Sequence, residues 1–214
     1  NLYRLFPLPH AGFFVMLRSV MTSYKEFQET LRTAGHYETA TQNQPLSPAR
    51  IKALNSFLYA STILGIVSRC AISRLFRRFD YEEWSRICMA SVVFAEKLGG
   101  VVTFEGFGQR AAYNGPVVYV SNHMSTLETM VFPTTLISFG KLAIVLKKSL
   151  TEIPLVGAAA LAVGSIAVTR KNAREDLKTV LEVGAKRLAE GHSVLLFPQG
   201  TRQAVFDGQT FNSL

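Results

Sequence analysis

The sequence is poor in the residues that build disulfide frameworks and metal centres. It contains two cysteines, Cys70 and Cys88, and four histidines among 214 residues. Two cysteines imply no disulfide framework, so a reducing compartment is the simplest environment for the protein. The histidines lie far apart and lack the paired spacing of metal ligands, so we predict no metal site.

Acidic residues are scarce relative to basic ones. The chain has 15 Asp and Glu against 23 Lys and Arg, a formal net charge of +8 at pH 7. This excess favours an anionic partner, which is a nucleic acid, a phosphate-bearing ligand or an anionic membrane. Hydrophobic residues make up 48% of the chain, whereas nucleic-acid-binding domains usually show a basic stripe on a polar background. We therefore expect no nucleic acid as a partner.

A long apolar run that would span a membrane is also lacking in the N-terminal half. The uncharged stretch 53–68 includes Asn55, Ser56, Ser61 and Thr62, and it is shorter than the roughly 20 apolar residues that a span requires. Six basic residues flank it: Arg50, Lys52, Arg69, Arg74, Arg77 and Arg78. This pattern predicts a helix that lies in the interface of an anionic membrane, and a core helix of a bundle is the alternative.

Residues 101–214 alternate predicted strands and helices. The expected strands are 101–104, 117–120, 142–146, 165–168 and 193–197. A helix over 172–190 carries its apolar residues on one face and ends at Gly191. Strand–helix–strand order with short loops predicts βαβ units. We expect an α/β fold with a largely parallel central sheet and flanking helices over 101–214, preceded by a helical, membrane-associating region over 1–100.

The stretch 117–128 places a histidine between a strand and a helix. Glu128 is the one charged residue, and His123 the one histidine, between residues 111 and 140. Residues five apart in a helix lie roughly 140° apart, so the two side chains meet only if His123 precedes the helix. A histidine oriented by a carboxylate is typical of a general base. The alternative is a capped helix start with a solvated glutamate.

Two arginines follow predicted strands after uncharged runs. Arg170 follows the strand at 165–168, and Arg202 follows the strand at 193–197. Ligands of α/β sheets bind beyond the carboxyl ends of the strands, and arginine offers bidentate hydrogen bonds to phosphate or carboxylate. Together with His123 at a third strand end, the two arginines predict an anion pocket. The alternative, that each caps a surface turn, requires two coincidences.

Three blocks of sequence carry a family resemblance. The first runs from Glu105-Gly106-Phe107 to Ser121-Asn122-His123 with an acid after the histidine, the second covers 148–170, and the third is Phe197-Pro198-Gln199-Gly200-Thr201-Arg202. Their order and spacing, over about half the chain, resemble the glycerolipid acyltransferase family, whose best-known members acylate lysophosphatidic acid. The family usually has Asp at the position of Glu128 and Glu at that of Gln199. A fourth, Val-Pro-rich family block is not found before Leu214, so we expect the domain to be incomplete at its C-terminal end.

The resemblance implies an O-acyltransferase of phospholipid synthesis. It would move a fatty acyl group from acyl-CoA or acyl-carrier protein, as co-substrate, to the hydroxyl of a lysophosphatidic acid-like acceptor, without another cofactor. His123 would take the hydroxyl proton and Glu128 would orient the imidazole, with backbone N–H groups at the helix start helping to stabilise the oxyanion.

Acceptor binding and location are implied in the same way. Arg170 and Arg202 would hold the acceptor phosphate, with Gly200 and Thr201 shaping the turn. The expected partners are membrane phospholipids, the lysolipid acceptor and the acyl donor. The expected location is membrane-associated, monotopic or peripheral, on the cytoplasmic face of the inner membrane.

Two alternatives stay open. One is a related acyltransferase that acts on another lysolipid, an aminolipid precursor or glycerol-3-phosphate. The other is a catalytically silent membrane-binding homologue, which the changes at Glu128 and Gln199 make conceivable.

Overall fold

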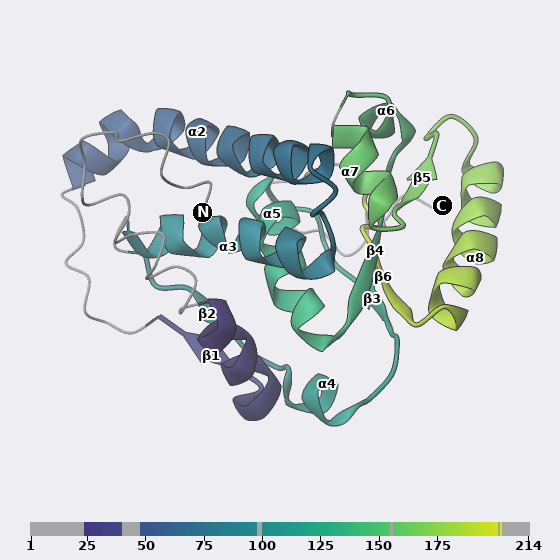
Figure 1. Cartoon of the computed structure of the whole chain (residues 1–214), viewed down its shortest axis with the longest axis horizontal. Helices are drawn as coiled ribbons and strands as arrows, with labels where there is room; N and C mark the ends of the chain where they lie inside the picture. The colour runs from purple at the N-terminus through teal and green to yellow at the C-terminus, as the bar shows by residue number, and fades with distance from the viewer. Residues whose placement is uncertain (1–23, 40–47, 98–99, 155, 201, 203–214) are drawn as a thin grey trace.

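The centre of the fold is a four-stranded parallel sheet, seen edge-on in Figure 1. The structure is a computed structural model that describes residues 24–39, 48–97, 100–154, 156–200 and 202. The strands are β3 (Val118–Val120), β4 (Lys141–Lys147), β5 (Ile166–Val168) and β6 (His192–Leu196), in the order β3-β6-β4-β5. All three strand pairs are parallel. The predicted α/β class and parallel sheet are confirmed.

The central position of β6 follows from its sequence. Its residues Ser193, Val194 and Leu195 are all buried, as expected of a strand covered on both faces. Register aligns Leu195 with Tyr119 of β3 and with Ile144 of β4. The carboxyl ends of β3, β4 and β6 therefore lie at the same edge of the sheet, where ligands of such sheets bind.

Helices connect the parallel strands on both sides of the sheet. The connections contain α5 (Leu127–Leu136) with the 3-10 helix η2 (Ile137–Phe139), then α6 (Lys148–Thr151) and α7 (Val156–Ala162), and finally α8 (Ala173–Ala189). Figure 1 shows α8 on one side of the sheet and α5 on the other. The α8 helix begins after Asn172, whose side chain accepts the backbone N–H of Glu175 at 3.3 Å. This is a regular N-cap, and it fixes the helix start close to the end of β5.

One predicted strand of the sheet lies elsewhere. Instead of a strand over 101–104, the structure has β2 (Thr103–Phe104), which pairs antiparallel with β1 (Tyr37–Glu38) in a separate two-stranded sheet. The aromatic rings explain this pairing, because Phe27 packs edge-on against Tyr37 at 4.7 Å and against Phe104 at 5.6 Å. A short helix, α4 (Gly108–Ala112), then leads to β3.

The helices that precede residue 100 share hydrophobic clusters with the sheet region. They are α2 (Pro48–Leu75) and α3 (Tyr81–Lys97), together with the helical residues 24–34. One cluster joins Phe27, Leu31 and Met89 to Phe104 and Val131. One hydrophobic cluster therefore contains residues from both sides of the boundary predicted at residue 100. The division of the chain into two regions stays a prediction.

The α2 helix has two different faces. Ile66, Cys70 and Ala71 are buried against α3 and α7, whereas Leu64 is 66% and Leu75 70% exposed. Within the described part of the chain, no helix combines the length and the apolar character needed to cross a membrane. The inner face of the helix is part of the hydrophobic core, as the core-helix alternative expected. The role of its outer face at a membrane interface stays a prediction.

Candidate active site

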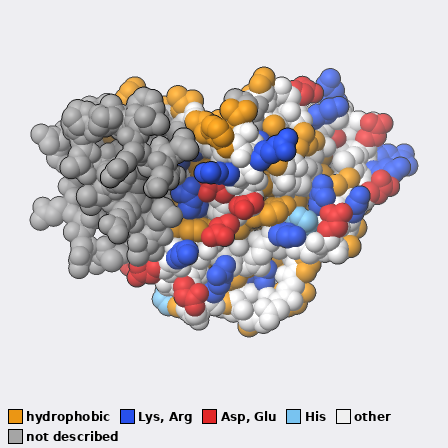
Figure 2. Space-filling model, in the orientation of Figure 1, with side chains coloured by type: hydrophobic (Ala, Val, Ile, Leu, Met, Phe, Trp, Pro, Cys, Tyr) orange, Lys and Arg blue, Asp and Glu red, His pale blue; other side chains and the backbone are white. Residues whose placement is uncertain are grey.

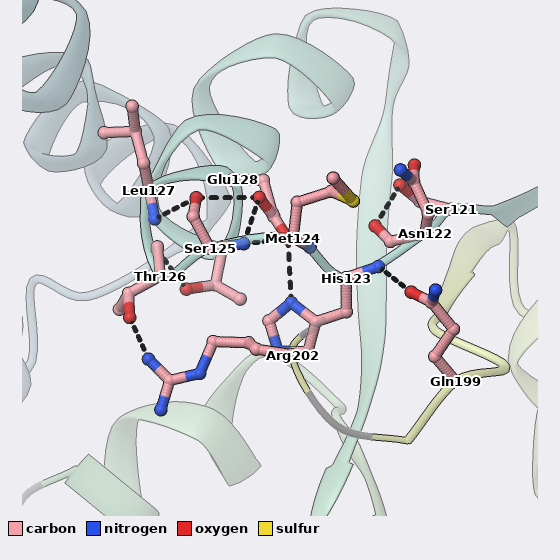
Figure 3. Close-up of polar contacts among 11 residues, drawn as sticks. Ser121, Asn122, His123, Met124, Ser125, Thr126, Leu127, Glu128, Gln199 and Arg202 are labelled. Atoms are coloured by element: carbon pink, nitrogen blue, oxygen red, sulfur yellow. Dashed lines mark hydrogen bonds and ion pairs between the residues drawn. The ribbon is translucent and has the colours of Figure 1, made fainter. Parts of the chain in front are cut away.

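The turn after β3 brings His123 and Glu128 together. His123 lies between the end of β3 and the start of α5, and Glu128 is the second residue of that helix. The imidazole Nδ1 lies 2.8 Å from Glu128 Oε1, and the two side chains are 15% and 18% exposed (Figure 3). The histidine lies outside the helix, which is the condition under which two residues five apart can meet. The predicted contact between His123 and Glu128 is therefore formed.

Glu128 also organises the turn around it. Its carboxylate accepts the backbone N–H groups of Met124 and Ser125 and the hydroxyl of Ser125. Burial acts to raise the pKa of Glu128, but the hydrogen bonds from His123, Ser125 and Met124 outweigh it and hold the pKa below its usual value. An ionised carboxylate can only accept, so Nδ1 donates to Glu128, which in the neutral imidazole leaves Nε2 with the lone pair. This is the tautomer that a general base requires.

The end of the neighbouring strand β6 completes the turn. The ring of Phe197 packs on the ring of His123, with 4.6 Å between centroids. Gln199 is fully buried, and its Oε1 accepts the backbone N–H of His123 at 2.5 Å. Gly200 has φ +67°, a left-handed conformation that glycine adopts without strain. Its N–H donates to Phe197 O at 3.0 Å, which closes the turn.

The two arginines reach the site from different strands. Arg202 Nη1 donates to the hydroxyl of Thr126, beside the His123–Glu128 pair (Figure 3). Arg170 follows β5 and lines the same cavity as His123. Thr201, the remaining predicted site residue, lies outside the described residues. The structure thus places His123, Glu128, Gly200 and Arg202 in one cluster, with Arg170 lining the same cavity as His123, while their roles stay predictions.

An apolar cavity of about 280 Å³ opens beside His123. Its lining also includes Ile66 and Cys70 of α2, Trp84 and Cys88 of α3, and Ala159 of α7. Burial raises the pKa of the Cys70 thiol to about 12 and that of Cys88 well above its usual value, so both thiols stay neutral and add to an apolar wall. Such a cavity suits a hydrocarbon chain.

The oxyanion expectation stays a prediction, and the structure narrows the set of backbone donors available for it. Four backbone N–H groups near the histidine are already bonded within the protein. The N–H of His123 is bonded to Gln199, those of Met124 and Ser125 to Glu128, and that of Leu127 to Ser125 Oγ. These four donors are engaged by Gln199, Glu128 and Ser125, so they do not point to a substrate.

Comparison with known proteins identifies the family. The profile of the family described as acyltransferase matches residues 102–210, which is just over half of the chain. The chain belongs to the acyltransferase family. The family profile covers the sheet, the His123–Glu128 turn and the Phe197–Arg202 segment, so the resemblance seen in the three sequence blocks is confirmed. The substitution of Glu for Asp at residue 128 is not tested by this match.

Two curated relatives of the acyltransferase carry the same functional name. The chain is 30% identical over 125 residues to a 1-acyl-sn-glycerol-3-phosphate acyltransferase of Pseudomonas aeruginosa, covering 58% of this chain and 46% of the relative. It is 34% identical over 105 residues to a chloroplastic 1-acyl-sn-glycerol-3-phosphate acyltransferase of Arabidopsis thaliana, covering 47% of this chain and 27% of the relative. The chain therefore spans less than half the length of either relative. No solved structure gives a significant match.

Sequence reasoning missed three parts of the acyltransferase site. Lys147 lines the cavity and is the last residue of β4. A cation at a strand end is the signal that predicted Arg170, and the same signal could have predicted Lys147. The contact from Gln199 to the His123 backbone has no sequence signal, because it joins residues 76 positions apart. Part of the cavity lining comes from α2 and α3, in the region 1–100 that the sequence predicted to associate with a membrane.

Proposed function

We propose that the protein transfers a fatty acyl group from a thioester to the hydroxyl of a lysophosphatidate-like acceptor. The observation that carries the proposal is the 2.8 Å contact between His123 Nδ1 and Glu128, at the wall of an apolar cavity that Arg170 also lines. The names of the relatives support the acceptor class. Acyl-CoA or acyl-carrier protein is the donor in this proposal, and no resident cofactor takes part.

The proposed reaction is a direct transfer in which His123 acts as base and then as acid. Nε2 takes the proton of the acceptor hydroxyl as its oxygen attacks the thioester carbonyl. Glu128 stabilises the imidazolium that forms and does not itself take up the proton. Collapse of the tetrahedral adduct breaks the carbon–sulfur bond, and the leaving thiolate takes the proton from the imidazolium. The products are an ester and a free thiol, without a covalent enzyme intermediate.

The cavity gives the acyl chain a place near His123. Its lining is predominantly apolar and includes residues of α2, α3 and α7. A chain buried there keeps the thioester carbonyl beside the imidazole, which reduces the entropy loss of the reaction. Lys147 and Arg170 line the same cavity with positive charge, and Arg202 lies by Thr126. In this proposal Arg170 and Arg202 bind the acceptor phosphate, and Gly200 and Thr201 shape the turn that carries Arg202.

The outer face of α2 is the proposed membrane-binding surface. Its exposed hydrophobic residues are Phe57, Leu64, Ile72 and Leu75, and exposed Phe76 follows directly after the helix. Figure 2 shows hydrophobic side chains along the upper edge of the molecule, over α2. Apolar side chains next to Arg69, Arg74, Arg77 and Arg78 fit peripheral binding to an anionic bilayer. We place this surface on the cytoplasmic face of the inner membrane, where the acceptor and the product reside.

An acyl-transfer assay tests the proposed function. The full-length protein is incubated with acyl-CoA or acyl-carrier protein and with lysophosphatidate, another lysophospholipid, glycerol-3-phosphate or an aminolipid precursor. We expect the highest kcat/KM with lysophosphatidate and loss of turnover in His123→Ala. Transfer to none of these acceptors would favour a catalytically silent membrane-binding protein, and preference for another acceptor would reassign the substrate.

A further inference from the structure

A buried carboxylate on α8 contacts the loop that carries Arg170. Asp176 lies in the first turn of α8 and is 7% exposed, whereas its neighbours Arg174 and Glu175 are exposed. Its Oδ1 accepts the backbone N–H of Thr169 at 2.7 Å and the hydroxyl of Thr169 at 3.0 Å, and its Oδ2 accepts the backbone N–H of Arg170 at 2.6 Å. One side chain thus satisfies two consecutive backbone donors at the end of β5.

Arg170 has a backbone conformation that needs such support. Its φ of +58° lies in the left-handed region, which residues with a Cβ rarely occupy. The hydrogen bonds from Thr169 and Arg170 to Asp176 hold the chain where it turns from β5 towards α8. The direction of the Arg170 side chain follows from this turn, and the side chain lines the cavity beside His123.

Capping of α8 does not explain the role of Asp176. The N-cap of the helix is Asn172, whose Oδ1 accepts the N–H of Glu175. The Asp176 carboxylate instead bonds backwards to the strand end. Burial acts to raise the pKa of Asp176, but the hydrogen bonds from Thr169 and Arg170 outweigh it and hold the pKa below its usual value. The carboxylate is therefore ionised at neutral pH, and both of its oxygens can accept the hydrogen bonds from Thr169 and Arg170.

We infer that Asp176 is a positioning residue for Arg170. It fixes the turn after β5 so that the guanidinium meets the phosphate of the acceptor at the cavity. The inference rests on the proposed function, because it uses Arg170 as the ligand of the acceptor phosphate. Asp176 touches no substrate, and its effect reaches the reaction through the arginine.

Steady-state kinetics of Asp176→Asn in the full-length protein tests the inference. The variant keeps the size of the side chain but removes the charge and replaces one acceptor by an amide N–H. We expect KM for lysophosphatidate to rise about tenfold, as for other misplaced binding groups. KM for the acyl donor and the rate with monoacylglycerol, an acceptor without phosphate, should stay within about twofold, since they do not use the arginine.

Glu175→Gln is the matched control, because it removes one acidic charge from the same turn of α8 at an exposed position. It should leave KM for lysophosphatidate unchanged. In an Arg170→Ala background, Asp176→Asn should add no further loss specific to the phosphorylated acceptor, because contacting residues that act as a unit are not additive.

Two outcomes separate the inference from the function on which it rests. If Arg170→Ala affects lysophosphatidate and monoacylglycerol equally, the phosphate role of Arg170 in the proposed function is wrong. If Arg170→Ala is selective but Asp176→Asn behaves as Glu175→Gln does, only the positioning role is wrong. If Asp176→Asn does not fold, Thr169→Ala decides, since it removes one of the three contacts and should raise KM for lysophosphatidate roughly threefold; an unchanged KM there overturns the inference.

Discussion

Gln199 Oε1 accepts the backbone N–H of His123 at 2.5 Å, which joins the turn after β3 to the turn after β6. The two strands are neighbours in the sheet, so a buried amide that follows one strand holds the turn with His123 that follows the other. The side chain of His123 is then oriented by Glu128 and packed on Phe197. The histidine is thus held through both its backbone and its ring.

Replacing Gln199 tests this support. Gln199→Met fills the same space but leaves the N–H of His123 without this acceptor, which should cost about 1–3 kcal/mol in the free energy of unfolding. We also expect a roughly tenfold lower kcat, because a small displacement of a catalytic group is costly. Denaturant unfolding and kinetics measure the two effects. Gln109→Met, at an exposed position of α4, is the control, and equal behaviour of the two variants would contradict the assignment.

Stability at acid pH should depend on Glu128 and Asp176. Both pKa values are lower in the folded protein than their usual 4.5 and 3.8. Each carboxylate therefore contributes stability that is fully present above those values and is lost as pH falls through the lower folded pKa. The free energy of unfolding of wild type should fall as pH decreases below about 4.5, and Glu128→Gln and Asp176→Asn should each show a shallower fall. Parallel pH profiles for all three proteins would contradict this prediction.

The size of the cavity should set the acyl-chain preference. Ala159 is buried in its wall on α7. Ala159→Leu adds apolar volume there, so kcat/KM should fall about tenfold for long-chain donors and much less for short-chain donors. A series of acyl-CoA donors measures the ratio. Ala158→Leu, at an exposed position of the same helix, should not change it, and a uniform loss over all donors would place the acyl chain elsewhere.

Membrane binding should depend on the exposed face of α2. Leu64→Ser combined with Leu75→Ser removes two exposed apolar side chains, each worth about 1.5–3 kcal/mol when buried. We expect at least about a tenfold weaker partition into anionic vesicles in a flotation assay. Leu181→Ser, exposed on α8, is the control on the other side of the sheet. Unchanged flotation of the double variant would assign membrane binding to another surface.

The sequence predicted the parts of the fold that rest on local patterns. Strand β6 is a continuous apolar run, and α8 has a clear apolar face with a cap and a terminal glycine, so both were found within one residue at each end. The β1–β2 pair was not predicted as such, because two-residue strands have no periodicity and their pairing depends on aromatic packing around Phe27. The inner face of α2 was predicted only as the alternative of a core helix, since charge and hydropathy do not show which face meets α3.

The candidate site also contains contacts that the sequence predicted and contacts that it did not. His123 and Glu128 are close in sequence, so the strand-to-helix pattern predicted that they meet if His123 precedes the helix. Gln199 and Asp176 act through backbone groups of other segments, and such contacts depend on strand order and loop geometry. They leave no pattern in a single sequence.

The central claim is that His123 is the general base of acyl transfer. The most direct test compares kcat for transfer to lysophosphatidate by wild type, His123→Ala and His36→Ala, an exposed histidine outside the site. Each protein is first shown to be equally folded by circular dichroism. We expect His123→Ala to lose at least about 100-fold in kcat and His36→Ala to match wild type. Turnover by folded His123→Ala at the wild-type rate would contradict the mechanism.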